Sequence, residues 1–258
     1  MDKKTSWGEV AEWYNELLSN DNDSYQNKVI LPNIIRIVDP KPQMKIADIA
    51  CGQGFFSFAF AQKGAQVVGC DISEELIKIA NIQKEKIQLS NVEFFVCPAN
   101  KTPIADNSID TVVINLALQN IEDLSGTIKE ISRILKPNGK FVLTLNHPNF
   151  RIPQRSSWQW DDKTNTQYRR IDGYMSETNS KIDMNPGENN STKKQFTYSF
   201  HRPLQNYFKA LVKNGFAVTR LEEWISHKES QPGPKQAEEN RIRKEIPMFM
   251  CLEGIIIK

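Results

Sequence analysis

The segment IADIACGQGFF, residues 46–56, decides the fold. A short apolar run contains the acidic residue Asp48, and it is followed by Gly52 and Gly54 and then by two phenylalanines. The run has the length of a buried strand and the residues after the glycines have helical period, which predicts a strand, a tight turn and a helix. In an open α/β sheet this turn lies at the carboxyl ends of the strands, where ligands bind. The turn either holds a nucleotide-like cofactor or only connects the two elements.

Apolar runs and helical segments alternate along most of the chain. Strands are predicted at 45–50, 66–71, 92–97, 109–116, 140–146, 216–225 and 249–257. Helices are predicted at about 6–19, 26–38, 55–63, 73–86, 123–136 and 204–213. The sequence KPNGK at 136–140 ends the helix before it and leads into the next strand. Such alternation predicts βαβ units on a parallel sheet of an α/β protein.

Residues 147–203 interrupt this alternation with a polar, aromatic-rich segment that is too long for an ordinary loop. Within it, QFTYSF at 195–200 alternates aromatic and polar residues, which predicts a half-exposed strand and a small β-rich cap. We therefore predict an N-terminal helical lid at 1–40, a cofactor-binding core at 41–146, an inserted substrate cap at 147–203, and the rest of the core sheet at 204–258.

Composition narrows the class of protein. The 258 residues carry 33 basic and 31 acidic side chains, a formal charge of +2, so a nucleic-acid partner is not expected. The four cysteines form no C-x-x-C pair and are interpreted as free thiols of a reducing compartment. No long apolar run or leader-like segment is present, so we expect a cytoplasmic protein with no membrane partner.

The turn departs from a dinucleotide-binding pattern. G-x-G-x-x-G would place a third glycine where Ser57 stands. Asp48 would repel a pyrophosphate but attract a cationic ligand that carries an ammonium group and a sulfonium. Asp71, at the end of the second strand, lies nineteen residues after Gly52 and is placed to accept hydrogen bonds from two ribose hydroxyls.

Four motifs then occur in order and spacing: DIACGQG at 48–54, VVGCDIS at 67–73, TPIADNSIDTVVINLAL at 102–118 and EISRILKPNGKFVL at 130–143. Together they resemble class I S-adenosylmethionine (SAM)-dependent methyltransferases of the small-molecule branch, which includes quinone-biosynthesis methyltransferases. The resemblance implies a doubly wound, Rossmann-like, seven-stranded and mostly parallel sheet with helices on both faces. It also implies SAM as cofactor, S-adenosylhomocysteine (SAH) as product and a small-molecule acceptor.

The resemblance assigns the cofactor site residue by residue. The loop around Ala50, Cys51, Gly52 and Gly54 contacts the methionine part, Asp71 binds the ribose, and Ala99 and Asn100 border the adenine. The cofactor site also takes Asp48, Ile72, Asn115 and the lid tyrosines Tyr14 and Tyr25. Two residues depart from the family pattern, because Ala50 replaces the first glycine and Pro98 replaces the acidic residue that faces the adenine amino group.

His147, directly after the fifth core strand, is the candidate general base for a hydroxyl or amine nucleophile. The alternative is that its ring only bonds the following turn. In the cap, the candidate substrate-binding residues are Trp158, Trp160, Tyr168, Arg169, His201 and Arg202, because aromatic rings can sandwich a flat acceptor and arginines can bind an acidic group. The alternative is that the aromatics form the cap's own core and that the arginines are solvated.

Other functions were weighed against methyl transfer. The histidines are far apart in sequence, so no metal site is expected. INLALQN at 114–120 differs from the Asn/Asp-Pro-Pro-aromatic motif of enzymes that methylate DNA bases or glutamine, which favours a small molecule. A non-catalytic SAM-binding or interaction protein and an NAD-dependent oxidoreductase are the alternatives. Asp48 and Ser57 disfavour the second of these.

Overall fold

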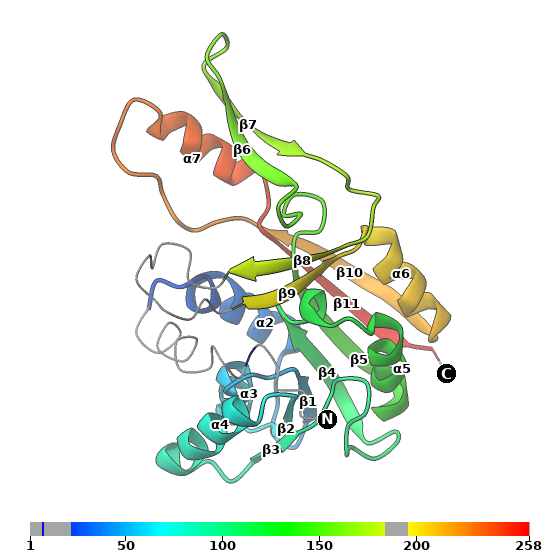
Figure 1. Ribbon diagram of the computed structural model, residues 1–258. Helices are drawn as coiled ribbons and strands as arrows, with labels where there is room; N and C mark the ends of the chain where they lie inside the picture. Colours follow the sequence, from blue (N-terminus) through cyan, green and yellow to red (C-terminus); the bar gives the residue numbers. More distant parts are fainter. Residues whose placement is uncertain (1–6, 8–21, 184–195, 258) are drawn as a thin grey trace.

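The computed structural model describes residue 7, residues 22–183 and residues 196–257 of the chain. Its centre is a seven-stranded sheet in the order β10-β11-β5-β4-β1-β2-β3 (Figure 1). The strands are β1 (Lys45–Ile49), β2 (Gln66–Asp71), β3 (Val92–Val96), β4 (Ile109–Asn115), β5 (Leu135–Asn146), β10 (Phe216–Trp224) and β11 (Phe249–Ile256). The pairs from β3 to β5 are parallel, whereas β11 pairs antiparallel with both β5 and β10. The predicted doubly wound, mostly parallel sheet is confirmed.

Helices cover both faces of this sheet because its strands are apolar on both sides. On one face pack a π-helical turn η1 (Gln26–Ile30), α2 (Leu31–Val38), α3 (Phe55–Gln62) and α4 (Glu74–Ile87). On the other face pack α5 (Leu124–Ile134) and α6 (Leu204–Lys213) (Figure 1). Neighbouring residues of one strand point into different cores, as Ile46 and Ala47 of β1 do. Each core therefore excludes water from one face of the sheet.

Local sequence explains where the helices begin and end. The Ser73 hydroxyl accepts the Leu76 N–H and caps α4, and Asp123 caps α5 by accepting the Gly126 N–H. One expected boundary is wrong: the helix predicted to reach residue 136 ends at Ile134, and β5 already begins at Leu135. The KPNGK segment lies inside a shift of register between β4 and β5 rather than before the strand.

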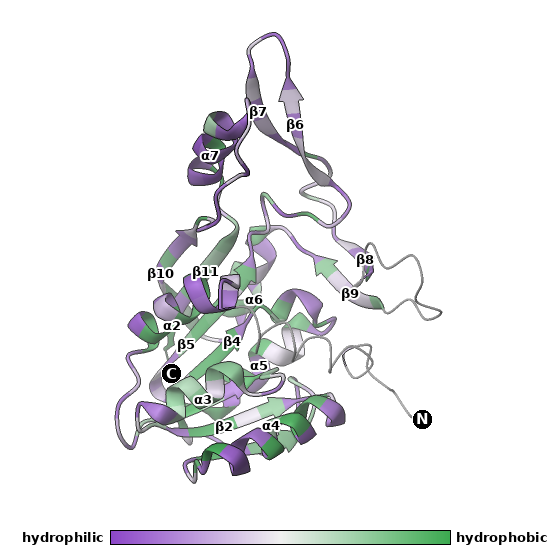
Figure 2. Ribbon diagram, turned by 90° about the vertical axis from the view of Figure 1, so that its left-hand side faces the viewer, coloured by the Kyte–Doolittle hydropathy of each residue, from purple (hydrophilic) through white to green (hydrophobic). Residues whose placement is uncertain are grey.

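The insertion at 147–203 contributes no described strand to the main sheet. It forms the hairpin of β6 (Ser156–Asp161) and β7 (Thr166–Ile171) and the pair of β8 (Thr178–Asp183) and β9 (Phe196–His201). Figure 2 shows the β6–β7 hairpin standing away from the sheet beside α7 (Gln236–Glu245), with mostly hydrophilic colours. The helix α7 lies in the charged segment for which no element was predicted. The expected strand at 195–200 corresponds to β9, but its buried residues are Thr197 and His201, whereas Tyr198 is exposed.

Several predictions concern the chain's N-terminal part and its cysteines. The helix predicted at 26–38 is present as η1 and α2, whereas Tyr14 and the helix at 6–19 lie outside the described residues. The roles of 1–40 as a lid and of 147–203 as a cap stay predictions. All four cysteines are free thiols, three buried and Cys97 half-buried. Among the described residues, no helix is both long and apolar enough to cross a bilayer.

Candidate active site

A cavity lies where β1, β2 and β4 end, at the turn that follows β1. Sixteen residues line it: Trp7, Asp48, Ala50, Cys51, Gly52, Gln53, Phe55, Phe56, Asp71, Ile72, Leu76, Asn115, Leu116, Ala117, Asn120 and Ile121. The space between them that no protein atom fills is about 770 Å³, part of it open to solvent. This lies in the range of small-molecule pockets and at the place where α/β sheets bind ligands. We call it the donor cavity below.

The turn after β1 is shaped by left-handed backbone. Ala50, Gly52 and Gly54 have φ of +57°, +57° and +84°. Gly54 needs to be glycine, because a Cβ there would lie 2.7 Å from the Phe94 ring. Ala50 departs from the first glycine of the family pattern in this same conformation, which costs a non-glycine residue roughly 1–2 kcal/mol. Leu116, across the cavity, is also left-handed with φ of +51°. Strained backbone on two sides of one cavity is typical of a functional site.

Asp71 forms part of the floor of the cavity and already holds the loop. Its Oδ2 accepts the Gly52 N–H at 2.9 Å, and its Oδ1 accepts the Ser73 N–H at 2.9 Å. The side chain is 7% exposed, and burial raises its pKa while these N–H groups oppose the rise. The Ile72 N–H also stabilises the charged form, and a carboxylate with about four lone pairs keeps acceptor capacity for a ligand beyond these three N–H groups.

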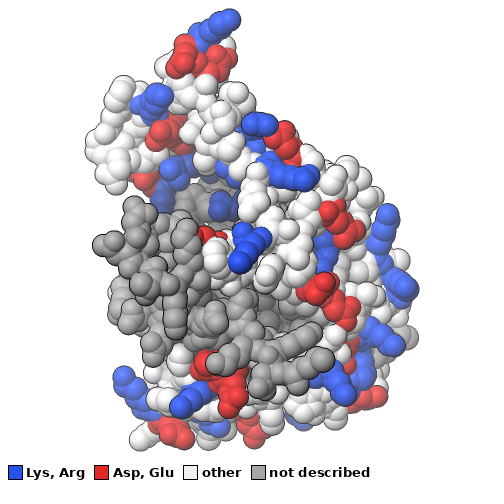
Figure 3. Space-filling view, in the orientation of Figure 1, with Lys and Arg blue, Asp and Glu red and all other residues white. Residues whose placement is uncertain are grey.

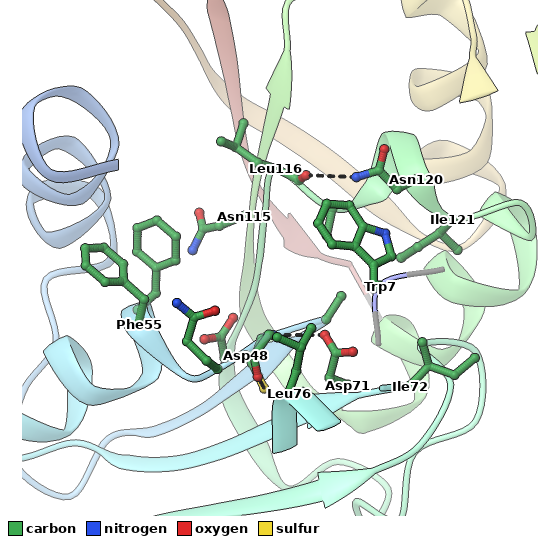
Figure 4. Close-up of a pocket in the computed structure, with 16 residues that line it drawn as sticks. Trp7, Asp48, Phe55, Asp71, Ile72, Leu76, Asn115, Leu116, Asn120 and Ile121 are labelled. Carbon is green, nitrogen blue, oxygen red and sulfur yellow. Dashed lines mark hydrogen bonds between the residues drawn. The ribbon is translucent and has the colours of Figure 1, made fainter. Parts of the chain in front are cut away.

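Asp48 is the second carboxyl group of the cavity and is only 1% exposed. The Ser57 hydroxyl donates to its Oδ2 at 2.6 Å, which explains why serine suits the position of the third glycine. Burial and the charge of Asp71 raise the pKa of Asp48 to about 7, and the Ser57 hydrogen bond opposes the rise. Figure 4 shows Asp48 and Asp71 on the same side of the cavity, with Asn115, Leu116 and Trp7 above them.

The cavity also contains polar atoms that lack a partner. Asn115 Oδ1 accepts the Thr144 hydroxyl at 3.1 Å, but Asn115 Nδ2 is buried with no hydrogen bond to any described residue. Gln53 Oε1 is likewise buried with no hydrogen bond to any described residue. Because buried polar groups are nearly always paired, one free donor and one free acceptor on a cavity wall indicate a ligand or ordered water there. No Lys or Arg is among the described residues that line this cavity, although two carboxyl groups are.

The structure brings most of the predicted cofactor residues to this cavity. Asp48, Ala50, Cys51, Gly52, Asp71, Ile72 and Asn115 line it. Gly54 shapes the turn by packing against Phe94 but is not on the lining. Ala99 and Asn100 are not on it either, and the Asn100 amide donates to Asp123 Oδ2 at 2.6 Å.

The lid residues divide between the cavity and the body of the protein. Tyr25, expected near the donor, is not on the described lining; its hydroxyl is 3.0 Å from the Ser226 hydroxyl and its ring packs against Phe249. Trp7, from the N-terminal part of the chain, lines the cavity. Sequence reasoning also missed Leu76, Asn120 and Ile121, which lie just beyond the motifs at 67–73 and 102–118.

His147 is buried, and both nitrogens of its ring have a hydrogen-bond partner. Its Nε2 lies 2.6 Å from Glu223 Oε1, and its Nδ1 accepts the Asn149 N–H at 3.2 Å. With Nδ1 as acceptor, Nε2 carries the proton and donates to Glu223. Burial lowers the pKa of His147, and Glu223 opposes this. The neutral ring therefore has no free lone pair for an acceptor's proton, and it does not line the donor cavity. These contacts favour the structural alternative, and the base role stays a prediction.

The predicted substrate-binding aromatics do not line the donor cavity. Trp158 and Tyr168 are exposed on the β6–β7 hairpin, and the Arg169 guanidinium lies 5.0 Å from the Trp158 ring centre. The Trp160 ring lies 4.3 Å from the Lys235 ammonium. Arg169 also donates to the Phe150 carbonyl. These contacts link the two strands of the hairpin and join it to neighbouring segments, and the substrate-binding role of its aromatic residues stays a prediction.

His201 and Arg202 lie elsewhere, where β9 returns to the main body. His201 Nε2 is 2.7 Å from the Tyr174 carbonyl. Arg202 Nη2 donates to the carbonyls of Ile121 at 3.0 Å and Glu122 at 2.6 Å. Through these hydrogen bonds Arg202 fixes the segment that forms one wall of the donor cavity. Within the described ranges, no three His, Cys, Asp or Glu side chains gather as a metal site would require.

Comparison with known proteins gives this arrangement a context. A family model described as a methyltransferase domain matches residues 40–202, more than half of the chain. The demethylmenaquinone methyltransferase of Bacillus cereus (strain ATCC 10987) is 35% identical over 111 residues, which are 42% of this chain and 47% of that protein. The Streptomyces avermitilis protein of the same name is 33% identical over 144 residues, 55% of this chain and 59% of that protein. The chain thus matches about half the length of these curated relatives.

A solved structure extends the likeness of the fold to most of the chain. The SAM-dependent methyltransferase from Mesorhizobium loti has a TM-score of 0.69 to this chain and 24% sequence identity. The match covers 87% of this chain and 96% of that one. It supports the fold that the sheet order shows.

Proposed function

The chain belongs to the methyltransferase domain family, in the class I SAM-dependent group that its motifs predicted, and from this premise we propose that it transfers the methyl group of SAM to a small-molecule acceptor. The observation that carries the proposal is the charge of the donor cavity. Asp48 and Asp71 line it, and its described lining offers no cationic side chain. A dinucleotide pyrophosphate would be repelled there, whereas a sulfonium and an ammonium group would be attracted.

The residues present fit SAM. Asp71 has lone pairs free for the two ribose hydroxyls while it holds the Gly52 N–H. The unpartnered Gln53 Oε1 and Asn115 Nδ2 offer an acceptor and a donor to the polar groups of the methionine part. Ile72 and Leu76, which line the cavity, offer apolar surface to the base. Pro98 leaves the adenine amino group without the family's acidic partner, so apolar contact must contribute more of the affinity.

The chemistry that SAM supplies is a methyl group on a sulfonium, which is ready for in-line displacement by a nucleophile. The protein then has to align the two reactants and exclude water, and alignment alone contributes on the order of 7–11 kcal/mol in favourable cases. Leu116 and Ala117 lie at the end of β4 and form the wall of the cavity beyond the turn. Their segment is fixed by the Leu116 carbonyl, which accepts the Gln119 amide at 2.6 Å, and by the grip of Arg202.

A small acceptor is favoured by the relatives, whose names specify demethylmenaquinone as a substrate. Because this chain matches only about half of their length, the acceptor cannot be carried over as such. We therefore propose a small-molecule acceptor for this chain, and we assign demethylmenaquinone only to those relatives.

Calorimetric titration of the protein with SAM, SAH and NADH tests the proposal. We expect saturable binding of the first two and none of NADH. Asp71→Asn removes the charge that the ribose hydroxyls meet and should weaken SAH binding roughly tenfold to a hundredfold. Asp162→Asn, in the exposed β6–β7 turn, is the matched control and should bind as the wild type does. Binding of NADH in place of SAH, or equal SAH affinity in all three proteins, would contradict the assignment.

A further inference from the structure

A second, smaller cavity lies beside the donor cavity, across the segment 116–121. Leu116, Ala117, Asn120 and Ile121 face the donor cavity, whereas Gln119 lines the second one. The other walls come from β9 and the residue after it, from the segment after β5, and from α6; they include Arg151, Phe200, His201, Arg202 and Tyr207. About 320 Å³ is free of protein atoms there. One turn of chain thus separates the two spaces.

Two buried side chains on this second cavity have unused hydrogen-bonding groups. Arg202 is 6% exposed; its Nη2 donates to two backbone carbonyls and its guanidinium lies beside Phe200 and Tyr207, but its Nη1 has no hydrogen-bond partner among the described residues. Gln119 is 8% exposed, and while its amide nitrogen serves the Leu116 carbonyl, its Oε1 has none. Leaving a buried charged donor unpaired is costly, since such groups are normally satisfied. The two atoms indicate a ligand that accepts from Arg202 and donates to Gln119.

The charge of the cavity selects the kind of ligand. Its lining includes the guanidinium groups of Arg151 and Arg202 and no carboxylate among the described residues. Neither arginine has an ion-pair partner in the described parts of the chain, whereas Arg36, Arg133, Arg170, Arg220 and Arg241 all do. In Figure 3 several Lys and Arg side chains, with one acidic side chain among them, border the hollow below the protruding hairpin. Two unneutralised guanidinium groups attract an anion, and arginine suits the oxygens of carboxylates and phosphates.

We propose that this second cavity binds an anionic oxygen group, a carboxylate or a phosphate, carried by the methyl acceptor. Arg202 Nη1 donates to the anion and Gln119 Oε1 accepts from a hydroxyl or water next to it, while Phe200 and Tyr207 contact the adjoining carbon atoms. The inference rests on the proposed function in one respect, because the donor cavity across the segment 116–121 makes the ligand an acceptor. It deepens that function by restricting the acceptor to acidic molecules rather than neutral ones.

Calorimetry on the protein saturated with SAH tests this inference, with benzoate, inorganic phosphate and neutral benzamide as probes. We expect saturable binding of an anion and none of benzamide, and the tighter of the two anions identifies the acidic group. Arg202→Gln should weaken that binding about tenfold or more, which is the loss of one charge-assisted hydrogen bond. Arg151→Gln, at an exposed residue, should weaken it severalfold. Arg170→Gln, on the hairpin and paired with Asp172, is the control and should change nothing.

Far-UV circular dichroism and urea denaturation of each variant separate misfolding from loss of the site, because Arg202 also holds one wall of the donor cavity and SAH binding alone does not report folding. If Arg202→Gln does not fold, the anion affinity of Arg151→Gln tests the proposal in its place. The proposal is overturned if neither anion binds the folded wild type saturably, if benzamide binds as tightly, or if the arginine variants that bind SAH keep the wild-type anion affinity. A protein that binds the anion through Arg202 but not SAH would refute the methyl-transfer function and leave the anion site standing.

Discussion

Asp48→Asn is expected to stabilise the ligand-free protein and to weaken its binding of SAM. Asp48 is 1% exposed, and the Ser57 hydroxyl donates a hydrogen bond to its carboxyl group. Asparagine keeps an oxygen that accepts this hydroxyl and removes the charge that burial disfavours. Ionising Asp48 costs stability in the ligand-free protein, but the ionised form attracts the cationic methyl donor SAM. Stability and function therefore oppose each other at this position.

The magnitude follows from the pKa of Asp48, which is raised from 3.8 to about 7 on folding. Because the raised pKa favours the protonated form, the contribution of Asp48 to stability is fully present below pH 3.8 and falls as the pH rises. It is lost above a pH of about 7. A shift of roughly three units at 1.36 kcal/mol each gives at most about 4 kcal/mol. The variant, which does not titrate, should equal the wild type in acid and exceed its free energy of unfolding by up to this amount at pH 8.

Urea denaturation of both proteins between pH 5 and pH 8 measures the effect, since the difference between the two curves isolates Asp48 from all other groups. The same pair titrated with SAM should show wild-type affinity rising as the pH passes about 7, and little change in the variant. A difference in unfolding free energy that does not depend on pH would refute the reasoning, because Asp48 would then have an ordinary pKa.

Two further substitutions test the turn after β1 and the role of His147. Gly54→Ala puts a Cβ 2.7 Å from the Phe94 ring at a φ of +84° and should cost about 1–3 kcal/mol in urea denaturation. Gly233→Ala, where a Cβ meets nothing within 4 Å, is the control, and an equal loss in both would contradict the packing argument. His147→Ala should lower the free energy of unfolding by about 1–3 kcal/mol, because it breaks the contact with Glu223 and empties a buried site, and should leave SAH affinity unchanged. Unchanged stability with loss of one limb of the pH profile of methyl transfer would instead assign His147 as the base.

The sheet was predictable because most of its strands contain a short apolar run, and α6 because its period is clear over 204–213. Both signals are local. The donor cavity followed in outline, since Asp48, Gly52 and Asp71 stand at strand ends whose positions the sheet dictates. The helix α7 was missed because only Ile242 is buried in it, so it has almost no apolar period.

The surroundings of several candidate site residues depend on partners that are distant in sequence. Glu223, which forms a hydrogen bond with the His147 ring, is 76 residues away on β10. The carbonyls that accept hydrogen bonds from Arg202 are about 80 residues before it. Trp160 is covered by Lys235 from the segment that precedes α7. One sequence shows that a histidine, an arginine or a tryptophan is present, but the fold decides which group satisfies it.

Transfer of a labelled methyl group tests the central claim most directly. The protein is incubated with SAM that carries a deuterated methyl group and with the small-molecule extract of the cells from which it comes, and mass spectrometry follows SAH and deuterated products. We predict that SAH and one labelled acidic small molecule form in equal amounts with the wild type, and that both are strongly reduced with Asp71→Asn. Saturable binding of SAM with no SAH formed from any fraction of the extract would contradict methyl transfer and favour a non-catalytic SAM-binding protein.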